Sequence, residues 1–146
     1  MKITFLGHAT LEIQINEFNL LVDPFISGNP MAFEINLDDL KPDFILISHA
    51  HQDHTLDVEK LAKDNNSLII SNFEIVSHFQ SKGLNGHPMN HGGKWNFDFG
   101  ELKYVNAIHT STFPDGSNGG QPGGFIITSN NKSISVSYTH LTLPTT

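Results

Sequence analysis

The chain has 146 residues, of which 38% are hydrophobic, and a formal net charge of -7 at pH 7. This length and apolar content suit one domain with its own core, and the negative charge argues against nucleic acid or an anionic membrane as a partner. Cysteine is absent, which excludes disulfides, thiolate metal sites and cysteine nucleophiles. Any metal must therefore be bound by imidazole and carboxylate groups.

The N-terminal part of the chain predicts three short strands. Residues 2–6 and 10–16 have strand character, and in LEIQIN apolar and polar residues alternate as in a half-buried strand. FNLLVD, residues 18–23, forms a third strand ending at Asp23, and we expect an antiparallel meander. The opening lacks the apolar run of a signal peptide and no stretch is long enough to span a membrane, so we expect a cytoplasmic protein.

A long loop and two strand–helix units are expected next. Residues 25–42 contain Gly and Pro and show no period, which predicts a loop with one helical turn. DFILIS is an apolar strand, and LDVEKLAKDN predicts a helix with Leu56, Leu61 and Ala62 on one face. SLII predicts another buried strand, and FEIVSHFQSKG predicts a helix that ends near Gly83.

The last part of the chain predicts further strands. GLNGHPMNHGG is expected to be a loop, and KWNFDFG and ELKYVNAIH form strands around a turn at Gly100, with His109 at the end of the second strand. GFIITSNNKSIS predicts a hairpin that turns at Asn130 and Asn131. Strands, then strand–helix alternation, then strands again indicate a mixed α/β domain in which helices flank a pair of sheets.

The stretch ISHAHQDHTLD, residues 47–57, concentrates His49, His51, Asp53 and His54 at the end of a buried strand. Open α/β sheets usually place their ligands there. Alternate side chains of an extended segment point the same way, so His49 and His51 can bind one cation, while Asp53 and His54 can face a neighbouring position. Zinc takes about four ligands and a catalytic site keeps one position open, so a third protein ligand must come from elsewhere.

His109 is the best candidate for this third ligand, because it too ends a strand and precedes a loop. The alternative is an ordinary histidine at a strand end. His8 lies between two strands and either lines the site or is structural. Asp23 either orients the cluster histidines from behind them or caps the turn at Pro24.

Other histidines and a glycine-rich stretch are weaker candidates. His78 lies on a helix and is expected to be solvent-exposed, whereas His87 and His91 lie in a polar loop and are candidates for substrate contact. Residues 115–124 lack the Lys-Ser/Thr ending of a phosphate-binding loop. We expect this stretch to form a flexible rim over the site.

Several segments together carry a family resemblance: MKITFLGHAT, LVDPFISGNP, ISHAHQDH, SNFE, HPMNHGG and the histidine of VNAIHTS. They resemble bacterial metal-dependent hydrolases related to ascorbate-6-phosphate lactonase, within the metallo-β-lactamase superfamily. The resemblance runs from Met1 to about Ser135 and implies an αββα sandwich. His91 departs from it, because an aliphatic residue is expected at that position in these relatives.

The resemblance implies a metal-dependent hydrolase that acts on a small ester, lactone or phosphoester. A first metal would be held by His49, His51 and His109, and a second would be served by Asp53 and His54. A bound metal makes hydroxide available near pH 7, and Asp53 would orient that hydroxide as the catalytic residue. Zinc is the favoured metal, with two ions in the intact protein, and manganese or iron would also suit these ligands. A non-catalytic metal-binding module is the alternative.

The C-terminal residues do not fit the resemblance, which also implies a bridging aspartate and a further histidine. The chain ends instead in VSYTHLTLPTT, and one reverse translation of residues 136–145 resembles the transposon-end adapter of sequencing libraries. We therefore expect residues 1–135 to be a partial metallo-β-lactamase domain and residues 136–146 to be a read-through tail, so that His140 is not a ligand. Such a fragment is expected to be inactive.

Overall fold

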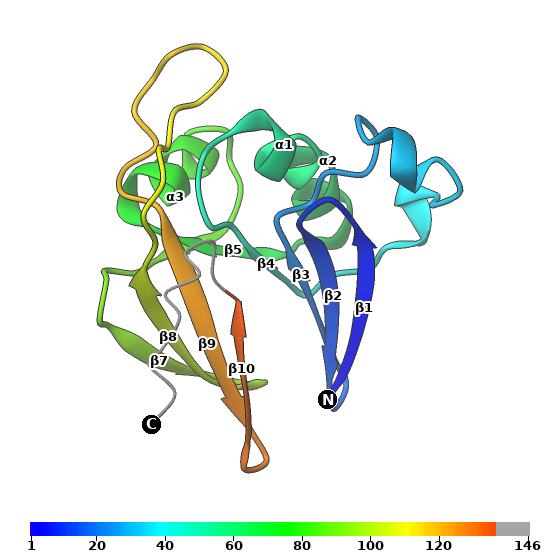
Figure 1. The fold of residues 1–146 in the computed structure, drawn as a ribbon, viewed down its shortest axis with the longest axis vertical. Coiled ribbons are helices and arrows are strands. Elements are labelled where there is room, and N and C mark those ends of the chain that lie inside the picture. The colour runs from blue at the N-terminus through cyan, green and yellow to red at the C-terminus, as the bar shows by residue number, and fades with distance from the viewer. Residues whose placement is uncertain (137–146) are drawn as a thin grey trace, which may run out of the picture.

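The computed structural model describes residues 1–136 and has a layered α/β fold (Figure 1). A six-stranded sheet of order β1-β2-β3-β4-β5-β6 packs against a four-stranded sheet of order β10-β9-β8-β7. The mixed α/β architecture predicted from the sequence is confirmed. Of the proposed tail, only Val136 belongs to the described residues, and it is the last residue of β10.

The first sheet consists of β1 (Lys2–Gly7), β2 (Thr10–Ile15), β3 (Phe18–Val22), β4 (Phe44–Leu46), β5 (Leu68–Ser71) and β6 (Gly86–Pro88). Strands β1 to β3 form the predicted antiparallel meander, and β3 to β6 are parallel. The segment containing β6 was predicted as a loop, because glycine and proline surround a strand of only three residues. The carboxyl ends of β3, β4, β5 and β6 meet at one edge of the sheet.

Helices cover the outer face of the first sheet: α1 (Gln52–Thr55), α2 (Val58–Asn65) and α3 (Phe73–Gln80). The helix predicted after the histidine cluster, in residues 56–65, corresponds to α2, and a separate short helix, α1, lies within the cluster itself. Leu61 and Ala62 lie buried on α2, but Leu56 lies between the two helices and is 38% exposed, so it does not share their helix face as predicted. The long loop contains two 3-10 turns, Pro30–Ala32 and Leu37–Asp39, where one helical turn was expected.

The second sheet consists of β7 (Lys94–Phe97), β8 (Gly100–Asn106), β9 (Gly123–Ser129) and β10 (Lys132–Val136). The β9–β10 hairpin turns as predicted at Asn130 and Asn131, whose φ angles of 50° and 59° asparagine tolerates. Strand β8 ends at Asn106, three residues before the predicted end at His109. The ladder stops there because the facing chain continues into Pro122, which has no N–H to donate.

Two apolar cores explain the layers. Alternate residues of the central strands point to opposite faces: Phe44 and Leu46 of β4 join Tyr104 and other residues between the sheets, whereas Ile45 and Ile47 join the helices. Three layers of the αββα sandwich are therefore present in the described part of the chain. No helix within residues 1–136 is both long and apolar enough to cross a membrane.

Candidate metal centre

The histidine cluster leaves the carboxyl end of β4 and enters α1, as the sequence predicts. His49 is buried three residues after the end of the strand, and His51 is the N-cap residue of α1. Asp53 and His54 lie within α1 itself, so the start of the helix turns them away from the direction of His49 and His51. The structure thus divides the four residues between two neighbouring groups of donors.

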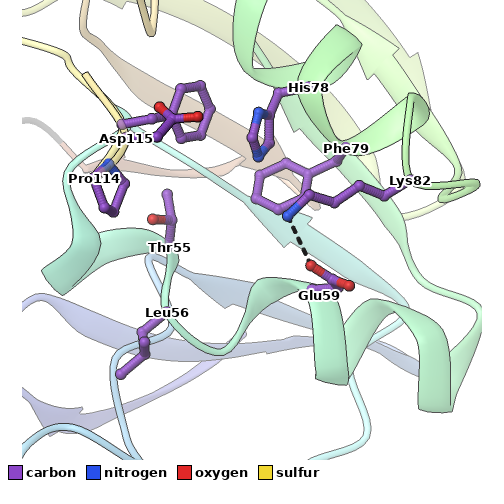
Figure 2. Close-up of a pocket in the computed structure, with 9 residues that line it drawn as sticks. Thr55, Leu56, Glu59, His78, Phe79, Lys82, Pro114 and Asp115 are labelled. Atoms are coloured by element: carbon purple, nitrogen blue, oxygen red, sulfur yellow. Dashed lines mark hydrogen bonds and ion pairs between the residues drawn. The ribbon is translucent and has the colours of Figure 1, made fainter. Parts of the chain in front are cut away.

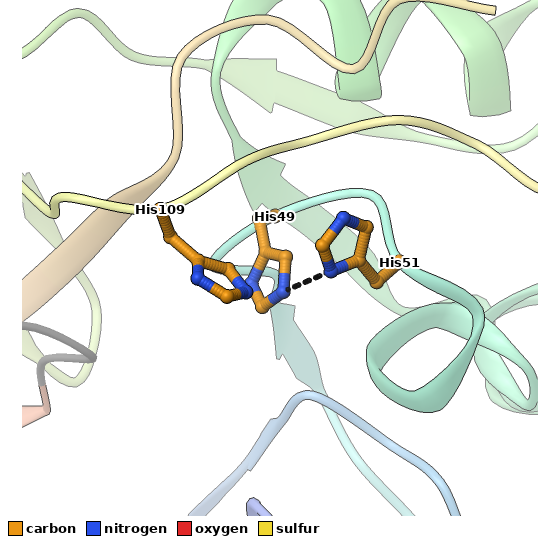
Figure 3. A group of neighbouring side chains, drawn as sticks. All are labelled: His49, His51 and His109. Carbon is orange, nitrogen blue, oxygen red and sulfur yellow. Dashed lines mark hydrogen bonds between the residues drawn. The ribbon is translucent and has the colours of Figure 1, made fainter. Parts of the chain in front are cut away.

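The first group consists of His49, His51 and His109 (Figure 3). One ring nitrogen of each lies within 4.8 Å of the others, and Nε2 of His49 is 3.1 Å from Nδ1 of His51. Two ligands of a tetrahedral zinc ion with bonds of about 2.0–2.1 Å are roughly 3.3 Å apart. The three imidazoles therefore fit one divalent cation, and His109 is the third residue that the sequence led us to expect.

Hydrogen bonds select the tautomer of His49 that can bind a cation. The Ser48 hydroxyl donates to Oδ2 of Asp23 over 2.6 Å, so Oγ of Ser48 accepts the proton of His49 Nδ1 over 2.8 Å. The Nε2 lone pair of His49 then points at Nδ1 of His51. On the other side of the His51 ring, Nε2 lies 3.3 Å from the Thr110 hydroxyl. A shared cation would satisfy both inward-facing nitrogens.

The second group consists of His8, Asp53 and His54, whose donor atoms also lie within 4.8 Å of one another. Nε2 of His8 donates to Oδ2 of Asp53 over 2.8 Å, and Nε2 of His54 is 3.6 Å from the same oxygen. The rings of His49 and His54 are 4.0 Å apart between centroids, so the two groups are adjacent. Sequence reasoning left open whether His8 lines the site or is structural, and the structure places it within this second group.

Asp23 lies behind both groups, at the end of β3, and its side chain is fully buried. Its carboxylate accepts hydrogen bonds from the backbone N–H of Ser48 at 2.7 Å, the hydroxyl of Ser48 and Nδ1–H of His54 at 3.0 Å. Through Ser48 it orients His49, and by direct contact it orients His54. Outer partners of this kind fix the tautomer and direction of metal-binding imidazoles.

Polar contacts across the chain bring His109 to the cluster. The Ser111 hydroxyl accepts the N–H of Ala50 at 3.1 Å and donates to the carbonyl of Gly119 at 3.0 Å. A Cβ at position 119 would collide with the Cβ of Ala50, so glycine permits this close approach. Buried Asn72 donates to the carbonyls of Gly119 and Gln121 over 2.8 and 3.0 Å.

Sequence reasoning missed Ser48, Asn72 and Ser111 as positioning residues. Ser48 and Asn72 follow parallel strands at the edge where the site forms, so the strand-end rule that singled out His49 could have found them. Ser111 offered no comparable signal, because its role depends on contacts with residues far along the sequence.

The remaining histidines lie outside the two groups. His91 Nε2–H donates to the carbonyl of Pro122 over 2.9 Å and its ring contacts Tyr104, so histidine at this unexpected position anchors the segment after His109. His87 packs against Trp95 and Phe97 on the β6 side of the sheets. Neither side chain is among the donors of the two groups in the described residues.

A separate cavity of about 260 Å³ lies between α2, α3 and the segment that follows His109 (Figure 2). Its walls include Leu56 and Phe79, and His78 stacks on Phe113 with ring centroids 4.0 Å apart. The predicted solvent exposure of His78 was therefore wrong, since the ring is half-buried against an aromatic neighbour. None of the donors in the two described groups lines this cavity.

Burial and neighbouring charges lower the pKa values of two imidazoles and one carboxyl group in the two donor groups. Burial, followed by the neighbouring His54, lowers the pKa of His49 to about 3, and burial, followed by His109, lowers the pKa of His51. Burial raises the pKa of Asp53, but the charge of His54 and hydrogen bonds that include the one from His8 outweigh it, so this pKa is lowered. At neutral pH His49 and His51 are uncharged and Asp53 is an anion, the states that bind metals.

The layered fold, with two candidate metal-donor groups at its sheet edge, is typical of an α/β protein of the metallo-β-lactamase type. Residues 2–141 match the family described as a beta-lactamase superfamily domain, and the chain belongs to this family. The superfamily predicted from the sequence motifs is thereby confirmed.

Individual relatives support the same assignment. The chain is 59% identical over 134 residues to a UPF0173 metal-dependent hydrolase of Flavobacterium johnsoniae, covering 92% of this chain and 60% of the relative. It is 58% identical over 135 residues to one of Christiangramia forsetii, with coverage of 92% and 60%. The solved structure of Igni18, a metallo hydrolase of Ignicoccus hospitalis, has a TM-score of 0.77 at 28% identity and covers 90% of this chain and 57% of its own. The chain thus spans about 60% of the length of these curated relatives.

Replacing Asp23 with asparagine should weaken metal binding. A carboxamide at this position cannot accept all three hydrogen bonds that the carboxylate accepts, so His49 and His54 lose their fixed orientation. We expect zinc affinity, measured by competition with a chromogenic chelator, to fall about 10–100-fold. Asp43→Asn is the matched control, because Asp43 is exposed and accepts a backbone N–H from Asn19. Equal zinc affinity in Asp23→Asn and wild type would contradict the orienting role.

Acid should destabilise the metal-free protein. The pKa of His49 is about 3 in the folded chain against 6.5 without its surroundings, so between these values the unfolded state binds the extra proton. The resulting loss in the free energy of unfolding is absent above pH 6.5 and grows as the pH falls toward 3. Urea unfolding with a chelator present should show up to about 1.4 kcal/mol lost per pH unit from this group. His49→Gln should reduce the slope, and an unchanged slope would count against a neutral His49.

Proposed function

We propose that this chain provides the metal centre of a hydrolase that cleaves a small ester, lactone or phosphoester. The observation that carries the proposal is the adjacency of two donor groups, His49, His51 and His109 in one and Asp53 with His54 in the other, at the strand-end edge of the first sheet. Relatives named as metal-dependent hydrolases support it.

The donor sets decide which metals suit the site. The first ion would be held by three imidazoles and the second by Asp53 and His54, with no thiolate in the chain. Nitrogen and oxygen donors suit zinc, which we favour, and also manganese and iron. The two donor groups are adjacent, because the His49 and His54 rings are in contact.

Bound divalent cations supply Lewis acidity and lower the pKa of the water they hold. The side chains contribute the rest. Asp53 is 45% exposed and its lowered pKa keeps it anionic, so it can accept a proton from a nucleophilic water and orient it, as predicted for the catalytic residue. His54 and His8 hold its carboxylate in place.

Space for a small substrate exists beside the first group. A cavity of about 360 Å³ is lined by His109 together with Asn106, Ile108, Gln121 and Pro122. Its size suits a small molecule, and the amide side chains of Asn106 and Gln121 can contact polar substituents. The net charge of -7 disfavours a polyanion such as nucleic acid as partner.

The proposed function can be tested in a chimeric protein that has the full length of the relatives. The 134 matched residues of this chain would be joined to the part of the Flavobacterium johnsoniae hydrolase that this chain does not match. With zinc, manganese or iron it should hydrolyse members of a panel of chromogenic esters, lactones and phosphoesters. His51→Ala should reduce turnover at least about a hundredfold. The 146-residue chain alone should bind metal with little or no turnover.

The control variant is His87→Ala, because His87 lies outside both donor groups. It should retain the activity of the chimera. Tight metal binding by a folded chimera without turnover of any panel member would favour the alternative function, a non-catalytic metal-binding module. Absence of bound metal would contradict both functions.

A further inference from the structure

His8 is held in an unusual backbone conformation at the turn between β1 and β2. Its φ angle is +53°, in the left-handed region. Six described residues other than glycine have positive φ; four are asparagines, and His8 and Asp23 are the other two. Asparagine tolerates this conformation readily, and aspartate and histidine also adopt it more often than most other side chains. The two residues other than asparagine, His8 and Asp23, both lie at the candidate metal centre, so these left-handed conformations coincide with the site.

Contacts orient the His8 ring toward the second group. Nε2 lies 2.8 Å from Oδ2 of Asp53, and the ring is 5.2 Å from that of His54 between centroids. On another side, Phe25 contacts the ring edge to face at 5.5 Å. The ring therefore has a packed support and a nitrogen directed at the donor atoms of the other two residues.

The donor geometry matches a site for one cation. His8, Asp53 and His54 each offer one atom, all within 4.8 Å of one another, and they come from the β1–β2 turn and from α1. Catalytic zinc sites use three protein ligands and leave a position open. The His8 side chain is 40% exposed, which leaves room for that open position. Asp53 and His54 alone would supply only two ligands.

We propose that His8 is a protein ligand of the second divalent cation, which it binds together with Asp53 and His54. The cation is of the class that imidazole and carboxylate prefer, such as Zn²⁺, Mn²⁺ or Fe²⁺. This inference rests on the proposed function, since it adds a ligand to one of its two ions. It gives the second ion three donors within the described residues, where the sequence indicated two.

The test is zinc stoichiometry and affinity in the 146-residue chain. His8→Asn removes the imidazole but keeps a residue that tolerates the left-handed turn. Wild type should bind two zinc ions per chain by elemental analysis and chelator competition. His8→Asn should keep the first ion and bind the second at least about a hundredfold more weakly. His87→Asn is the control and should match wild type.

A second comparison separates ligation from an effect on folding. Asp53→Asn should weaken the same ion, and the double variant should weaken it little more than Asp53→Asn alone, because both residues bind one cation. Two ions of unchanged affinity in His8→Asn would overturn the His8 assignment and leave the proposed function standing. A single ion in wild type, lost in His51→Ala, would also overturn it. No zinc in wild type would instead contradict the proposed function itself.

Discussion

The buried carboxylate of Asp23 is the group on which the arrangement of the candidate metal centre depends. It accepts three hydrogen bonds, two from Ser48 and one from His54, although no part of its side chain reaches solvent. A buried carboxylate is costly unless it is fully hydrogen-bonded, and the Asp23 backbone has a left-handed conformation, with φ of 45°, which aspartate tolerates. This single carboxylate connects the end of β3, the segment after β4 and α1. It orients one imidazole of each donor group.

Parallel strands position one part of the candidate site, and loop contacts position His109. Parallel strands bring Asp23, Ser48 and Asn72 to one edge, because β3, β4 and β5 are in register there. His109 arrives from the second sheet, and its segment is fixed by Ser111 and Asn72 rather than by strand pairing. The first group therefore forms only when both sheets are packed together, which links metal binding to the inter-sheet core.

The features that the sequence predicted are those that depend on residues close together along the chain. The HxHxDH spacing indicated two half-sites, and the structure places Asp23 and His109 beside them, although His109 lies three residues beyond the end of β8 rather than at the strand end that was expected. The missed features depend on contacts between distant segments: the exposure of Leu56, the stacking of His78 on Phe113 and the hydrogen bonds of Ser111. Strand β6 escaped notice because glycine and proline outweighed a strand signal of three residues. His8 was recognised only as a residue near the site, because its direction depends on a left-handed turn.

The central claim is that three imidazoles hold the first ion through Nε2 of His49, Nδ1 of His51 and a ring nitrogen of His109. A crystal structure of the zinc-loaded 146-residue chain, with anomalous data at the zinc edge, tests it most directly. The account predicts an anomalous peak at about 2.0–2.1 Å from those three nitrogens. Zinc bound elsewhere, or bound with the His49 ring turned so that Nδ1 no longer donates to Ser48, would contradict it.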